Sequence, residues 1–218
     1  MAQVVFQGFA GRLEGDYVQS RDVHAPVALI LSPHPQRGGN FKSPEVLLLR
    51  NAFSRVGFST FSFNFRGVGH SEGICSKGEG ELSDAASAMD WIQTTYAEAC
   101  AFWMGGFCFG AWVGLQLLVR RPEIKGFVVG NLPVDTHDFG FLTPCPTSGL
   151  VLHGRNASVS STRSVNMIVE KMMSQKHLRI QYDIVDGASN MLLEQSDYIE
   201  VIIQGYLKSQ SAARRIVA

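Results

Sequence analysis

The segment from residue 101 to residue 119 reads AFWMGGFCFGAWVGLQLLV and is the most informative part of the sequence for the fold. It carries no charged side chain, and a membrane-spanning helix needs about 20 such residues, so its length alone would allow a span. Glycines at 105, 106, 110 and 114 interrupt such a helix. We therefore predict a buried strand over 101–106 that turns sharply into a buried helix over 109–120, and no membrane span.

The turn between these two elements has the form glycine, any residue, nucleophile, any residue, glycine, with Cys108 at its centre. Small glycines allow the tight turn that presents a nucleophile at a helix N-terminus. The backbone N–H of Phe109 is then placed to donate to an oxyanion. A second donor is expected from the PHPQRGG loop (33–39), where Pro35 has no N–H, so Gln36 is the candidate.

Apolar runs and helical segments alternate on both sides of this turn. Alternation at this spacing predicts an α/β fold with a doubly wound, mostly parallel sheet flanked by helices. Residues 1–218 are expected to form a single domain, with antiparallel edge strands near 4–7 and 16–19. Further strands are predicted at 27–32, 58–65, 126–131, 149–153 and 178–185, and further helices at 44–55, 78–96, 162–174 and 192–208.

The composition excludes several classes of protein. Nineteen acidic and nineteen basic side chains leave no net charge, which argues against a dedicated nucleic-acid binder. Neither C-x-x-C pairs nor zinc-type spacing occur, so we expect no metal and no cofactor. The N-terminus lacks a secretory signal, so we expect a cytoplasm or an organelle matrix rather than secretion. The cysteines, expected as free thiols, are Cys75, Cys100, Cys108 and Cys145.

Five strings carry a resemblance to a known family, and this resemblance runs from about Gly11 to the C-terminus. They are PHPQRGG (33–39), FNFRGVGHSEG (63–73), GEGELSDAASAMDWIQ (78–93), GGFCFGAWVGLQLL (105–118) and DFGFLTPCP (138–146). On these strings the chain resembles the short, dienelactone-hydrolase-like group of bacterial α/β-hydrolases. The resemblance implies an α/β-hydrolase fold without a separate cap domain, a Ser-Asp-His triad and the hydrolysis of small esters.

The triad that the resemblance implies has other residues at all three of its positions. Cys108 stands where the group has serine. Ala157 ends the string HGRNA (153–157), where the pattern H-G-x-x-D has its carboxylate. Asn190 ends DGASN (186–190), where P-G-A-x-H has its histidine. Loss of a nucleophile or base costs about a million-fold in turnover. One hypothesis is therefore a catalytically degenerate protein, a binding or structural subunit with a protein partner or a second copy of itself.

The alternative hypothesis is a cysteine-dependent hydrolase or thioesterase-like enzyme acting on small acyl esters. A thiol of pKa near 8.5 is only a few per cent ionised at neutral pH, although the helix N-terminus after Cys108 would lower that pKa. Asp135 or Asp138 could supply an acid. The relocated base would be a histidine at the carboxyl ends of the strands, where ligands bind in this architecture. The candidates are His34, His70, His137 and His153.

Overall fold

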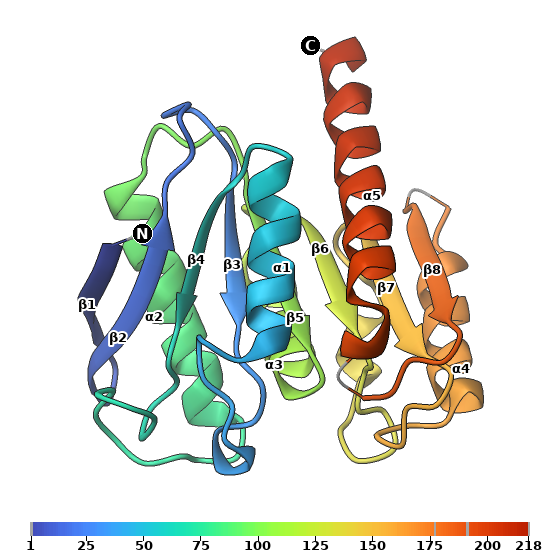
Figure 1. Cartoon of the computed structure of the whole chain (residues 1–218), viewed down its shortest axis with the longest axis horizontal. Coiled ribbons are helices and arrows are strands. Elements are labelled where there is room, and N and C mark those ends of the chain that lie inside the picture. The colour runs from blue at the N-terminus through green and yellow to red at the C-terminus, as the bar shows by residue number, and fades with distance from the viewer. Residues whose placement is uncertain (1, 177, 191, 218) are drawn as a thin grey trace.

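A computed structural model describes residues 2–176, 178–190 and 192–217 of the chain. Its eight strands form one sheet in the order β1-β2-β4-β3-β5-β6-β7-β8 (Figure 1). Strands β3 to β8 run parallel, whereas β2 is antiparallel to both β1 and β4. The strands are β1 (Ala2–Gly8), β2 (Gly11–Val18), β3 (Val27–Leu31), β4 (Ser59–Phe63), β5 (Phe102–Phe107), β6 (Ile124–Gly130), β7 (Gly149–Gly154) and β8 (Ile180–Val185).

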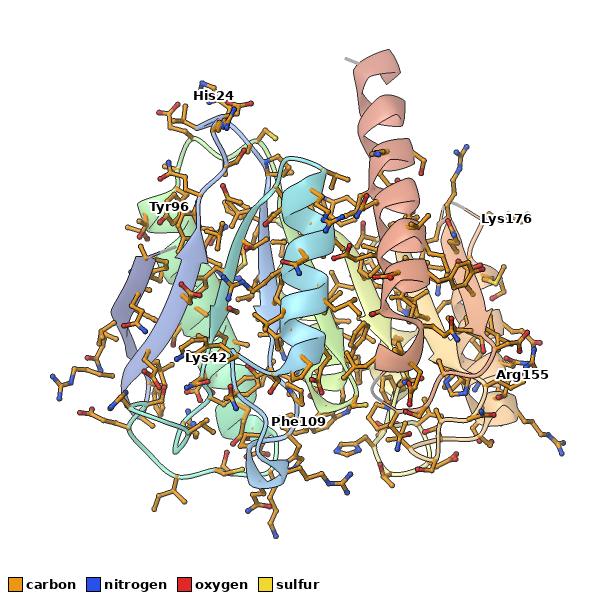
Figure 2. All side chains as sticks on the ribbon, viewed as in Figure 1. His24, Lys42, Tyr96, Phe109, Arg155 and Lys176 are labelled. Carbon is orange, nitrogen blue, oxygen red and sulfur yellow. The ribbon has the colours of Figure 1, made fainter. Side chains whose placement is uncertain are left out.

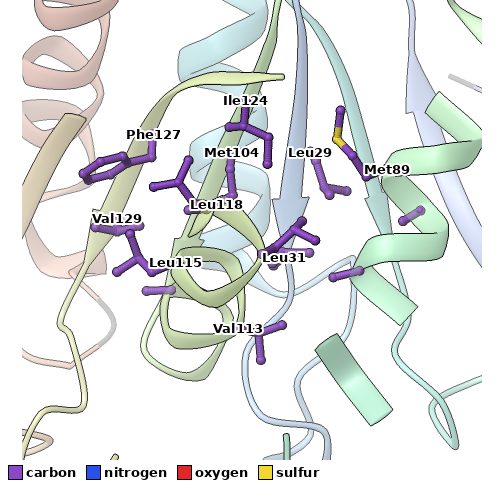
Figure 3. Packing of buried hydrophobic residues seen from close by; sticks show 14 of the residues in the cluster. Leu29, Leu31, Met89, Met104, Val113, Leu115, Leu118, Ile124, Phe127 and Val129 are labelled. Carbon is purple, nitrogen blue, oxygen red and sulfur yellow. The ribbon is translucent and has the colours of Figure 1, made fainter. Parts of the chain in front are cut away.

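Helices cover both faces of the sheet, so its central strands are continuously apolar, as in the wholly buried VALIL of β3. Helices α1 (Pro44–Arg55) and α5 (Ser196–Val217) pack on one face (Figure 1). Helices α2 (Glu79–Thr95), α3 (Phe109–Arg120) and α4 (Thr162–Met173) cover the other. Figure 3 shows this second core, in which Leu115 and Leu118 of α3 lie against Met104 and Val129 of the sheet.

The fold predicted from the sequence is confirmed. The sheet is mostly parallel and doubly wound, and the two N-terminal strands form an antiparallel edge. The 131–148 connection, between β6 and β7, contains only the short 3-10 turn η2 (Gly140–Leu142), so it forms no cap. The last helix starts at Ser196 instead of near 192, because the 3-10 turn η3 (Leu193–Gln195) precedes it, and it continues to Val217 instead of ending near 208.

The uncharged stretch 101–119 folds as predicted, into β5 followed by α3. In the described part of the chain, no helix is both long enough and apolar enough to cross a membrane.

Two buried ion pairs fasten helices to the sheet and its loops. Arg66, just after β4, holds Asp84 of α2 through two guanidinium contacts of 3.0 and 2.7 Å. Arg50 of α1 pairs with Asp16 of β2 at 2.8 Å. All four side chains are almost wholly buried, so each charge depends on its partner. The Arg66–Asp84 pair also fixes the loop that follows β4 against the start of α2.

Candidate functional site

The turn between β5 and α3 has the geometry that its glycines predict. Cys108 has φ +49° and ψ −117°, a strained conformation for a residue with a side chain. A Cβ at Gly106 would lie 2.7 Å from the carbonyl carbon of Gly110, and a Cβ at Gly110 would lie 2.6 Å from the Leu31 carbonyl oxygen. Only glycine therefore fits at either position, and the turn presents Cys108 at the N-terminus of α3.

A cavity of about 630 Å³ opens over Cys108. It lies at the carboxyl ends of the strands, where Figure 2 places Phe109 among the loops at the lower edge of the sheet. A volume of this size suits a small organic molecule. The residues that line it are Pro33, His34, Arg37, Gly38, Gly39, Ser43, Pro44, Glu45, Cys108, Phe109, Pro133, Thr136, His137, Ser158, Val159 and Asn190.

The Cys108 thiol is held in its neutral form. Burial, and to a smaller extent the nearby Glu45 carboxylate, raise the pKa of Cys108 to about 12, while Arg37 acts in the opposite direction. The Sγ atom contacts the backbone carbonyl oxygen of Asn190 at 3.6 Å, and a neutral thiol can donate there. The depressed pKa expected from the helix N-terminus does not result, because desolvation is the larger effect.

The side chain of Asn190 joins the loop after β8 to the loop after β7. Its Oδ1 accepts from the Val159 N–H at 2.9 Å, and its Nδ2 donates to Ser158 Oγ at 2.8 Å. Ala157, the residue before Ser158, does not line the cavity and has only a methyl side chain. Neither Ala157 nor Asn190 can accept and return a proton. The amide therefore joins the two loops without providing a base.

His34 is one of the two proposed bases that line the Cys108 cavity. Its ring packs against that of Phe109 with 4.5 Å between centroids, and burial lowers its pKa. Its Nδ1 accepts the Gln36 N–H at 3.1 Å. The neutral ring therefore carries its proton on Nε2 and acts there as a hydrogen-bond donor. The same contact occupies the N–H that we proposed as the second oxyanion donor, and Gln36 does not line the cavity.

His137 is the other proposed base that lines the cavity. Thr136 Oγ1 lies 3.3 Å from the Pro133 carbonyl oxygen and 2.9 Å from His137 Nδ1. When the hydroxyl donates to Pro133, Nδ1–H donates to Oγ1 and Nε2 is an acceptor; when the hydroxyl donates to Nδ1, Nε2 carries the ring proton. Burial lowers the pKa of His137, with His34 adding to the effect. Burial therefore favours the neutral imidazole at His137.

The structure places the remaining two histidines away from this cavity. His70 is almost fully exposed and pairs with Glu14 at 3.0 Å, beside a separate pocket of about 340 Å³. His153 is completely buried in β7, and neither of its ring nitrogens has a hydrogen-bond partner among the described residues. The carboxyl ends of parallel strands span the width of a sheet. Histidines after different strands therefore need not meet.

The two candidate acids after β6 serve the local backbone. Asp135 accepts the Ser161 N–H at 2.8 Å, next to the start of α4. Asp138 accepts the Gly140 N–H at 2.9 Å within its own loop. Both carboxylates therefore have backbone partners that hold the loops in place.

Two charged residues of the cavity were not among the sequence candidates. Glu45 follows Pro44 in the first turn of α1, a position where an acidic residue ordinarily matches the helix dipole. Instead it is 3% exposed and lines the cavity, where burial raises its pKa. Arg37 is exposed at the rim of the cavity. The residues around Glu45 do not distinguish it from an acidic residue that is exposed to solvent in the first turn of a helix.

Asn131 provides a further constraint that the sequence did not reveal. It is fully buried after β6 with φ +48°. Its Nδ2 donates to the carbonyl oxygens of Ser189 and Asn190 at 2.9 and 2.7 Å, and its Oδ1 accepts from Gly154 N–H at 2.8 Å. Asn131 thus fixes the loop that carries Asn190 beside Cys108.

Within the described ranges, no three histidine, cysteine, aspartate or glutamate side chains form a group that could hold a metal ion.

Sequence and structure comparisons connect the chain to known proteins. The family profile described as X-Pro dipeptidyl-peptidase (S15 family) matches residues 17–207. The uncharacterized protein RP471 of Rickettsia prowazekii is 38% identical over 211 residues, which cover 95% of this chain and 89% of RP471.

Solved structures show the same architecture. ATU1826 of Agrobacterium tumefaciens, a proposed alpha/beta hydrolase, superposes with a TM-score of 0.93 and 43% identity, covering 97% of both chains. An alpha-beta serine hydrolase homologue from Coxiella burnetii superposes with a TM-score of 0.86 and is 25% identical, covering 94% of this chain and 97% of the homologue. XC6422 of Xanthomonas campestris, an a/b serine hydrolase without a lid, superposes with a TM-score of 0.86 and is 22% identical, covering 96% of this chain and 94% of XC6422.

Proposed function

The chain belongs to the X-Pro dipeptidyl-peptidase (S15) family, within the α/β-hydrolase superfamily, and we propose that it nevertheless binds a ligand without hydrolysing it. In this proposal the triad is degenerate at Cys108, Ala157 and Asn190, and the protein serves as a binding or structural subunit of a larger assembly. The observation that carries the proposal is the state of Cys108. Its thiol is neutral, with a pKa raised to about 12, and it contacts a backbone carbonyl oxygen instead of a base.

A protein partner or a second copy of this chain belongs to the same proposal. Phe9, at the turn between β1 and β2, and Ile74, in the loop before α2, are both more than four-fifths exposed. In this proposal the partner covers these two side chains, because removing apolar surface from water favours association. Light scattering coupled to size exclusion tests the self-association part, because a monomer has a mass of 23.9 kDa.

The place of action is part of the proposal as well. All four cysteines are free, which fits a reducing cytoplasm or organelle matrix. We also propose that residues 1–218 act as one domain, since a single sheet joins β1 to β8.

A second candidate function is a cysteine-dependent hydrolase or thioesterase-like enzyme for small acyl esters, and His137 is the observation that favours it. In the tautomer with its proton on Nδ1, its Nε2 could take the Cys108 proton while sulfur bonds to the acyl carbon, then return that proton to the departing alcohol. Water would next cleave the thioester. This reaction requires the thiol to lose a proton that burial strongly retains, so binding without hydrolysis is the better supported function.

Turnover of p-nitrophenyl acetate and p-nitrophenyl butyrate separates the two functions. The wild type, Cys108→Ala, His137→Gln and His70→Gln are compared, the last as a control outside the cavity. We expect wild type and Cys108→Ala to have equal rates, close to that of buffer. A wild-type rate that falls at least a hundredfold in both Cys108→Ala and His137→Gln, but not in His70→Gln, would establish the hydrolase instead.

A further inference from the structure

Strand β1 is an edge of the sheet whose outer side is unprotected. It is the last strand in the sheet order, and Figure 1 shows it beyond β2. Proteins usually guard such an edge with charged residues, prolines or bulges. Residues 2–10, which read AQVVFQGFA, contain no charge and no proline, and β1 pairs with β2 without a shift in register. The fold therefore leaves a regular, uncharged edge to which another strand can bind.

The pairing of β1 with β2 determines which backbone groups face outward. Opposite residues of an antiparallel pair alternate between bonded and non-bonded positions, and Val5 lies opposite Glu14. The Glu14 carbonyl oxygen accepts from the Asn64 N–H at 2.9 Å, so Glu14 bonds away from β1. Val5 therefore directs its own N–H and C=O to the free edge, as do Gln3 and Gln7. In the described part of the chain, these outward groups have no hydrogen-bond partner.

The side chains of β1 divide between a buried face and an exposed face. On the buried face, the ring of Phe6 lies 5.8 Å from that of Trp91 in α2. On the other face Val5 is 66% exposed, and Phe9 in the adjoining turn is 87% exposed. Exposed apolar groups beside free backbone groups favour a partner that offers both apolar contact and main-chain hydrogen bonds. A β-strand supplies both.

The sequence of β1 selects a second copy of the chain as that strand. Around Val5 it reads QVVFQ (3–7), with a glutamine at each end. Antiparallel pairing about a two-fold axis at Val5 places Gln3 opposite Gln7 and Val4 opposite Phe6. The second of these is a β-branched and aromatic pair, which stabilises sheets. Because residues 2–10 are uncharged, no like charges meet, and one patch serves both copies, as a two-fold dimer requires.

We propose that two copies of this chain pair antiparallel through β1, so that their sheets join into one continuous sheet centred on Val5. This inference rests on the self-association part of the proposed function. It leaves the Cys108 cavity open, because none of the residues that line this cavity belongs to β1.

Light scattering coupled to size exclusion, run over a range of concentrations, tests the proposal. We expect the wild type to have twice the monomer mass of 23.9 kDa. Val5→Lys places two ammonium groups opposite each other and should weaken association by at least about a hundredfold. Val5→Pro removes an outward N–H, which edge strands tolerate, and should weaken association about tenfold. The matched control is Val201→Lys in α5, where the valine is also 66% exposed, and it should leave the mass unchanged.

Disulfide trapping tests the register of the pairing. Two copies of Val5→Cys would have their Cα atoms about 5.5 Å apart, within the range of a disulfide. Two copies of Gln7→Cys would lie roughly 14 Å apart, which is too far, because each lies opposite Gln3 of the other copy. In a Cys75→Ser, Cys100→Ser background, we expect oxidation to cross-link Val5→Cys and not Gln7→Cys.

Several results would overturn the assignment of β1 as the interface. They are a monomeric wild type, a dimer that persists in Val5→Lys, a dimer lost in Val201→Lys, and equal cross-linking at the two cysteine positions. Failure of the proposed function is a separate result. Ester turnover that depends on Cys108 would refute binding without hydrolysis, and it would leave the measured mass as it is.

Discussion

Iodoacetamide should alkylate Cys108 about a thousandfold more slowly at pH 9 than it alkylates a thiol with an ordinary pKa. A pKa of about 12 leaves roughly one thiol in a thousand ionised at pH 9, against about three in four for a pKa of 8.5. The reason is burial, because the thiolate would lose its hydration in the wall of the cavity. Mass spectrometry of the labelled peptide gives the rate for Cys108, and the exposed Cys100 shows that the reagent is active.

The shape of the pH profile distinguishes a raised pKa from a merely hidden thiol. With a pKa of about 12, the rate should rise about tenfold per pH unit up to pH 11 without a plateau. A hindered thiol of ordinary pKa would be slow but would level off above about pH 9. In Glu45→Gln the profile should move to lower pH, because the carboxylate adds to the effect of burial. A plateau below pH 9 in the wild type would refute the reasoning.

Three further predictions concern stability, each measured by urea unfolding. Burial lowers the pKa of His153, so below about pH 6.5 the unfolded state takes up a proton that the folded state does not. The free energy of unfolding should therefore fall as the pH falls, by up to about 1.4 kcal/mol per pH unit, and it should fall less steeply in His153→Leu. Equal acid slopes in the two proteins would contradict this. Asp84→Ala strands the Arg66 charge and should cost about 3–5 kcal/mol, whereas a loss under 1 kcal/mol would mean that water replaces the carboxylate. Asn131→Ala removes three hydrogen bonds and should cost about 2–4 kcal/mol; an unchanged midpoint would show that these bonds do not hold the loop.

Much of the fold was predictable because its signals are local. The uncharged run 101–119 contains a strand, a glycine-flanked turn and a helix in order, and each shows in its own residues. Apolar runs that fit a sheet covered on both faces appear again at β3, β6 and β7. The error at the start of α5 arose because the turn η3 has helix-forming residues but not α-helical hydrogen bonding. The end of α5 and the start of β2 were missed by more, since the helix continues to Val217 and the strand begins at Gly11.

The site was less predictable, since it depends on distances between loops that follow different strands. His34, His70, His137 and His153 all follow or end strands, yet only His34 and His137 line the cavity. The local sequence around His153 does not show that its ring is buried in the core. Glu45 was missed for the same reason, because a proline–glutamate helix start looks identical whether it faces solvent or a cavity.

Local signals along the chain specify the order of the elements, the parallel sheet and the chemical identity of the residue at the turn, because backbone preference and hydrophobic periodicity act over a few residues. The protonation of that residue and the polarity of its surroundings follow from the tertiary structure instead. Burial of the Cys108 thiol and the closeness of Glu45 set its pKa. Both are properties of the assembled cavity, because desolvation depends on every segment that excludes water from the atom.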